Sequence, residues 1–171
     1  MPRQFHDPES LFEPAPLLRR LLAMLYDGLI CIAVLILATW GYTMFVAWII
    51  GFDKYLEMAE AGAFNRDPML TSVLFVILYL FFAYFWTRTG QTLGMQVWRI
   101  RIENYDGSSI SWTQALKRYM AAYVSWIPAG LGYLWLLWDP RRETWPDKFS
   151  GTQVVAVPAP PKPAKNGKSP N

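Results

Sequence analysis

Two charged side chains stand at the start of a long apolar stretch, and both are of types that bind ions or relay protons. Asp27 is the only charged residue among the 32 residues from Leu21 to Phe52, and Arg20 lies seven positions before it. A carboxylate inside a bilayer costs about 3 kcal/mol or more unless it is paired or hydrated. The sequence therefore predicts a partner for Asp27.

Helical spacing places Arg20, Ala23 and Asp27 on one stripe, because steps of three and four keep the same face. Asp27 lies about 10 Å along the axis from Arg20, too far for an easy direct pair. We therefore expect a second partner from another segment or another subunit. Two interpretations remain open: a carboxylate that binds a cation or a proton, or a buried hydrogen-bonding post between helices.

Composition excludes several other kinds of chemistry. Hydrophobic residues make up 53% of the 171 residues and charged residues only 17%, below the usual quarter of soluble domains. One cysteine, Cys31, and one histidine, His6, leave little for a metal site or imidazole catalysis. There is no glycine-rich phosphate loop and no basic-aromatic interleaving suited to nucleic acid. We expect a protein that is not an enzyme and needs no cofactor or metal.

The hydrophobic pattern predicts an all-α integral membrane protein. Residues 17–50 and 68–87 are each long and apolar enough to cross a bilayer as a helix. A third apolar segment, 119–138, is interrupted by residues that break helices, so it forms either a re-entrant hairpin or a third span. The interrupting residues are Pro128, Gly130 and Gly132.

The stretch between the second and third segments alternates charged and apolar residues over 97–102, which predicts a small interfacial β-ribbon or loop. Ser111 and Gln114 form the signature of a capping box that opens a helix. Three regions follow: an N-terminal cytoplasmic arm over 1–15, a membrane domain over 16–156, and a disordered tail rich in proline and lysine over 157–171.

Lysine and arginine counts favour the hairpin. The first connecting loop holds only Lys54 and Arg66, and the other 14 basic residues lie elsewhere. If the third segment turns back, all 14 share one side of the membrane. If it crosses, the two sides hold eight each. The positive-inside rule favours the first arrangement, with both termini in the cytoplasm and the protein in a bacterial cytoplasmic (inner) membrane.

Four motifs in order together resemble the RDD family of membrane proteins over about residues 15–156. They are RRLLAMLYDGL at 19–29, GQTLGMQVWRIRI at 90–102, YDGSSISWTQALKRYM at 105–120 and WPDKFSGTQVV at 145–155. The arginine and two aspartates that name the family match Arg20, Asp27 and Asp147. One departure is Trp145-Pro146 before Asp147, where many members have His-Asp, and it removes a titrating group from that position.

The resemblance implies a multi-pass membrane domain whose members have been linked to cation or proton exchange, to export, or to assembly of membrane complexes. For this chain, the first expectation is an oligomeric exchanger or transporter that uses Asp27. The alternative is a non-transporting scaffold or assembly factor in which Arg20, Asp27 and Asp147 form a structural polar clasp.

The clasp makes a geometric prediction: Asp147 lies near Arg19 or Arg20. Further accessory candidates are Arg141 and Arg142, which suit anionic lipid head groups. The expected partners are the lipid bilayer, those head groups, and further copies of this chain or other membrane proteins.

Overall fold

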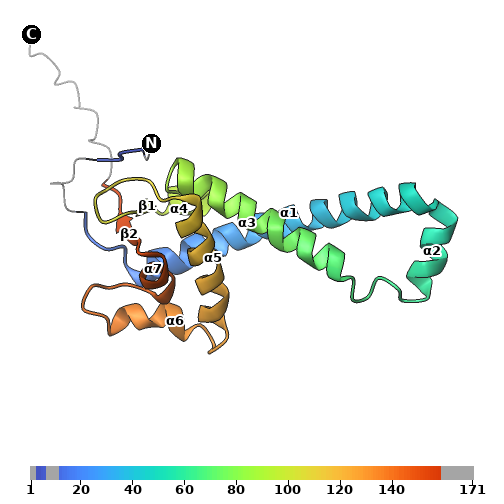
Figure 1. The fold of residues 1–171 in the computed structure, drawn as a ribbon. Helices are drawn as coiled ribbons and strands as arrows, with labels where there is room; N and C mark the ends of the chain where they lie inside the picture. Colours follow the sequence, from blue (N-terminus) through green and yellow to red (C-terminus); the bar gives the residue numbers. More distant parts are fainter. Residues whose placement is uncertain (1–2, 7–11, 159–171) are drawn as a thin grey trace, which may run out of the picture.

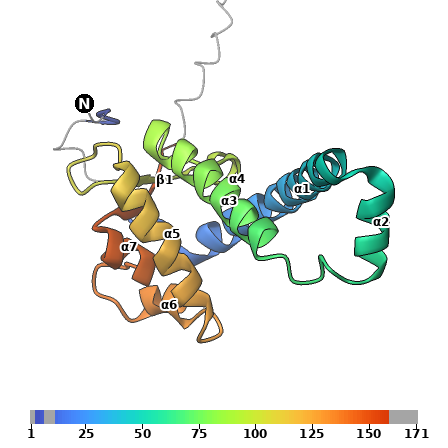
Figure 2. The same ribbon diagram turned by 45° about the vertical axis from the view of Figure 1, so that its right-hand side comes forward.

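The computed structural model describes residues 3–6 and 12–158. Two long helices, α1 and α3, cross each other, with α2 at one end and the remaining elements gathered at the other (Figure 1). A turned view shows the same separation of α2 from α5, α6 and α7 (Figure 2). The elements in chain order are α1 (Leu17–Ile50), α2 (Phe52–Glu60), α3 (Pro68–Arg88), α4 (Leu93–Val97), β1 (Ile100–Glu103), α5 (Trp112–Trp126), α6 (Leu131–Leu134), the 3-10 helix η1 (Trp135–Leu137), α7 (Trp145–Ser150) and β2 (Gln153–Ala156).

The two predicted spans are confirmed as helices. The helical stretches Leu17–Ile50 and Pro68–Val97 are long and apolar enough to cross a membrane. At about 50 Å, α1 exceeds the 30 Å hydrocarbon core. Asp67 caps α3 by accepting hydrogen bonds from the backbone N–H groups of Met69 (2.8 Å) and Leu70 (3.2 Å). Tyr42 donates its hydroxyl to Asp67 at 2.6 Å, which ties α1 to the start of α3.

The third hydrophobic segment turns back. Its two helical parts, Trp112–Trp126 and Leu131–Leu137, are bent by 110° at the break between them. Ala129 and Gly130 both have positive φ there, at 53° and 82°. The predicted capping box at Ser111 and Gln114 is present at the start of α5. The segment is therefore a hairpin rather than a straight third span.

The predicted ribbon exists, but its strand partner was not foreseen. β1 pairs antiparallel with β2, with Ile100 opposite Ala156 and Glu103 opposite Gln153. A turn at Asp106 and Gly107 follows β1, but the residues after this turn do not form the second strand. The chain before α1 joins this ribbon, since Ala15 N–H donates to the carbonyl of Val154 at 2.9 Å. Both ends of the membrane domain consequently meet on one side.

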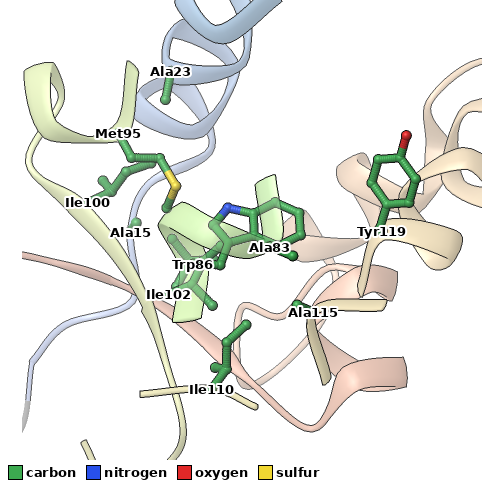
Figure 3. Packing of buried hydrophobic residues seen from close by; sticks show 11 residues of the cluster. Ala15, Ala23, Ala83, Trp86, Met95, Ile100, Ile102, Ile110, Ala115 and Tyr119 are labelled. Carbon is green, nitrogen blue, oxygen red and sulfur yellow. The ribbon is translucent and has the colours of Figure 1, made fainter. Parts of the chain in front are cut away.

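The core lies where the ribbon meets the first turns of α1 and the last turns of α3. Trp86 sits in the middle of it, with Met95 and Ala23 on one side and Ile102 and Ala83 on the other (Figure 3). Ile100 and Ile102 are both 2% exposed, as the alternation in β1 predicts. The predicted tail over 157–171 lies outside the described residues from residue 159 onward.

Candidate functional site

Asp147 is fully buried and forms ion pairs with two arginines. Its Oδ2 lies 2.6 Å from Nη1 of Arg20, and its Oδ1 lies 2.7 Å from Nη2 of Arg118. Both arginines are themselves buried. The prediction that Asp147 lies beside Arg20 is confirmed. We call Arg20, Arg118 and Asp147 the clasp.

Local structure places Asp147 in the first turn of α7. Thr144 precedes the helix, and its backbone N–H donates to Oδ2 of Asp147 at 2.9 Å. A carboxylate at this position satisfies a donor that the helix itself leaves free. Pro146 suits the first turn because its missing N–H would have no helical partner there.

Arg20 connects three further parts of the chain. Its Nε donates to the carbonyl of Ala15 at 3.0 Å, and its Nη2 donates to the carbonyls of Val154 at 3.2 Å and Arg142 at 3.3 Å. The guanidinium fork of arginine suits such simultaneous contacts. One side chain thus fixes the entry to α1, the ribbon and the loop before α7 relative to one another.

The sequence analysis did not identify Arg118 as a site residue. It lies next to Lys117, and adjacent basic residues usually belong to a solvent-exposed helix face. In the structure its Nη1 donates to Oγ1 of Thr152 at 2.8 Å, and its guanidinium lies over the Trp86 ring at 5.7 Å. One signal was available: Arg118 follows Ala115 by three residues and precedes Tyr119, so it shares the buried stripe of α5.

Asp27 has a different set of partners. Its Oδ2 accepts the hydroxyl of Thr92, and its Oδ1 accepts the backbone N–H of Gly94 at 2.9 Å. Both donors belong to the GQTLG motif that opens α4. The expected second partner is therefore found in another segment of the same chain, and it is not a cation.

Gly94 makes this contact sterically feasible. A Cβ atom there would lie 2.4 Å from the carbonyl oxygen of Ala23 and 2.9 Å from Oδ1 of Asp27. Only glycine lets the backbone of α4 approach α1 so closely. The α1 residue at this close approach is Ala23, which is also small. At Gly28 a Cβ atom would meet nothing within 4 Å.

The two arginines hold Asp147 ionised. Burial by itself would raise the pKa of this carboxyl, but Arg118 and Arg20, with the Thr144 hydrogen bond, lower it to about 2. A buried pair of this kind depends on having every partner in place, because an isolated charge in the interior is strongly unfavourable.

A cavity of about 240 Å³ lies between Asp27 and the clasp. Its walls include Asp27, Arg20 and Arg118, together with Trp86 and Tyr133. The remaining lining is largely apolar, from α1, α3, α5 and the ribbon. The cavity has room for a few water molecules or a small solute.

The accessory candidates do not join the clasp through their side chains. Arg142 contributes only its carbonyl, and the side chains of Arg19, Arg141 and Arg142 are exposed. The sequence analysis also missed a further buried carboxylate. Glu103 in β1 is fully buried and lies 2.9 Å from Arg101 and 3.0 Å from His6. The His6 contact shows that the N-terminal arm packs onto the ribbon.

Two membrane-crossing helices, a returning third segment and a buried Arg-Asp cluster between them define a multi-pass membrane domain. The RDD family model matches residues 14–151. This chain belongs to the RDD family. Neither a comparison with curated proteins nor one with solved structures returns a match.

Proposed function

We propose that this chain is a non-transporting membrane scaffold or assembly protein whose charged residues hold its fold. The observation that carries this proposal is that all four carboxylate oxygens of Asp27 and Asp147 already have partners within the protein. Both oxygens of Asp27 accept hydrogen bonds from α4, and both oxygens of Asp147 face arginines. A carboxylate that carries ions must exchange its partners in each cycle. These carboxylates are instead bound by groups that also fix the helices.

The outer surfaces of the spans supply the partner-binding face. Large apolar side chains along α1 are exposed, among them Leu29, Ile32, Ile36 and Trp40. In a bilayer such a face meets lipid or the helices of another membrane protein. The proposed partners are further copies of this chain or other membrane proteins, with lipid around them. We propose no enzymatic reaction, because the polar groups of the site are engaged in structural bonds.

The proposed location is a bacterial cytoplasmic membrane with both termini in the cytoplasm. The charge distribution supports it: 14 basic residues lie outside the α1–α3 loop, and Ala15 and Val154 share one end of the domain. The positive-inside rule assigns that end to the cytoplasm.

One observation favours transport as a second candidate. The cavity brings Asp27, Arg20 and Arg118 to the same walls, so a small ion could approach the carboxylate. Two spans per copy enclose no pore, and an exchanger would therefore require several copies.

Ion flux into proteoliposomes that contain only this protein separates the two candidates. The scaffold proposal predicts proton and cation flux equal to that of empty vesicles. Flux above that background, abolished by Asp27→Asn in a variant that is folded in the same vesicles, would establish the exchanger instead. Cys31→Ala serves as the matched control, because Cys31 is on the same helix one turn further and lies outside the site.

A further inference from the structure

A second groove, separate from the clasp, lies at the end of the molecule that holds the ribbon. Its volume is about 560 Å³, and it is formed by the first turn of α1, the corner between α4 and β1, and the chain after β2. Its charged lining residues are Arg19, Arg99 and Glu13. Nothing in the proposed scaffold role uses these side chains.

The two arginines of the groove are unpaired within the described residues 3–6 and 12–158. Neither side chain forms an ion pair or hydrogen bond there, whereas Arg20, Arg101 and Arg118 all pair with buried carboxylates. Both are exposed. Two exposed guanidinium groups that line one groove and have no protein partner there are suited to an oxyanion, which arginine binds through paired N–H groups.

The backbone holds Arg99 in an uncommon conformation. Its φ is +51°, in the left-handed region that side chains other than glycine seldom adopt. Its carbonyl accepts the backbone N–H of Val157 at 2.8 Å, and the carbonyl of Glu13 accepts that of Ala156 at 2.9 Å. Backbone hydrogen bonds therefore join the end of β2 both to Arg99 and to the chain before α1, which fixes the backbone of the groove walls.

Apolar residues also line the groove. Val97 is 58% exposed, and Trp98 lies edge-on to Tyr26 of α1 with ring centroids 6.2 Å apart. The indole nitrogen of Trp98 is buried without an acceptor among the described residues. Tryptophan and tyrosine favour the depth of lipid head groups. A ligand in this groove would meet both cationic and apolar side chains.

We propose that this groove binds the head group of an anionic phospholipid, with the phosphodiester between Arg19 and Arg99 and the acyl chains along Val97 and Trp98. The formal charge of the groove is +1, because Glu13 offsets one arginine. That matches the single negative charge of a lipid such as phosphatidylglycerol. A zwitterionic lipid brings no net charge and should bind less well.

Native mass spectrometry of the full chain in detergent tests this site. Phosphatidylglycerol should bind the unmodified chain, and Arg19→Gln with Arg99→Gln should weaken its binding about tenfold or more, since each cation near a lipid phosphate contributes measurably. Lys54→Gln with Arg66→Gln, which removes two cations at the opposite end, is the matched control and should change nothing. Phosphatidylcholine should bind weakly to all three proteins.

Equal phosphatidylglycerol binding by the Arg19 and Arg99 variant would overturn the proposal. Full displacement of the lipid by millimolar inorganic phosphate would also overturn it, because the groove would then recognise phosphate alone. Glu13→Gln provides an independent check that keeps both arginines: it should strengthen binding by removing a like charge, and unchanged or weaker binding counts against the site. Flux measurements do not depend on this groove, so its failure leaves the scaffold proposal untouched.

Discussion

The two family aspartates, Asp27 and Asp147, are both buried, but the groups that compensate their charge differ. Asp27 is 5% exposed and accepts from uncharged donors, a hydroxyl and an amide. Asp147 is fully buried and balances one of two arginine charges. A buried carboxylate among uncharged donors can be replaced by an amide more easily than one that neutralises cations. The two positions should therefore differ in how they tolerate asparagine.

Substitutions at Asp27 test this difference. Asp27→Ala should lower the free energy of unfolding by about 1–3 kcal/mol, because Thr92 and Gly94 lose their buried acceptor. Asp27→Asn should recover roughly half of that loss, since its carbonyl oxygen still accepts a hydrogen bond. Unfolding in mixed micelles measures both, with Cys31→Ala expected near zero. An alanine variant as stable as the parent would show that Asp27 is merely hydrated.

Acid should weaken the clasp in a defined range. The pKa of Asp147 is lowered from 3.8 to about 2, so its stabilisation is complete above pH 4 and is lost as pH falls through 2. The shift corresponds to a contribution on the order of 2 kcal/mol.

Thermal unfolding of the parent and of Asp147→Asn, followed from pH 6 to pH 2.5, isolates this contribution from that of other carboxylates. The difference between the two proteins should shrink as the pH falls below 4. A difference that stays constant across the range would mean that Asp147 does not titrate as the ion pairs require.

Among the secondary-structure elements, the sequence predicted those features that depend on local hydrophobicity and short motifs. The bounds of α1 and α3, the cap at Ser111 and the break after α5 all follow from runs of residues or from short motifs. The pairing of β1 with β2 joins residues 50 to 56 positions apart, and no local pattern specifies it. The short helices α4 and α7 were not predicted, because each depends on a tertiary contact of a carboxylate. The start of α4 binds Asp27 of α1, and α7 begins around Asp147, which pairs with Arg20 and Arg118.

The hairpin depends on the small size of Gly132. A Cβ atom there would lie 2.4 Å from Oγ of Ser125 and 2.8 Å from its Cα, so α6 could not lie against α5. Gly132→Ala should destabilise the fold by about 1–3 kcal/mol through overpacking. Gly41→Ala is the control, because a Cβ atom there meets nothing within 4 Å. Unfolding in micelles compares them, and equal stability would show that α6 is not held against α5.

For the whole molecule, the returning segment decides the topology. Arg118 comes before the hairpin and Asp147 after it, yet they are in contact. A full third crossing would separate them by about 30 Å. The contact therefore supports the proposal of two crossings, with the two ends of the domain lying together.

Cysteine labelling in intact cells tests which side those ends occupy. In a Cys31→Ala background, Ala61→Cys in the loop after α2 should react with a membrane-impermeant reagent from outside. Ala159→Cys should react only after the cells are opened. Labelling of residue 159 from outside would contradict the proposed orientation. Labelling of neither position in intact cells would also contradict it, because the loop after α2 would then not be exposed on the outer side.

In the scaffold proposal, the clasp stabilises the domain as a coupled unit and does not serve as an exchangeable ion site. A double-mutant cycle between Arg118→Gln and Asp147→Asn, measured by unfolding in mixed micelles, tests it directly. Each single variant should lose about 3–5 kcal/mol, since it leaves a buried charge unpaired. The double variant should lose about 1–3 kcal/mol less than their sum. Losses that add to within about 0.5 kcal/mol, or single losses too small to measure, would contradict the clasp.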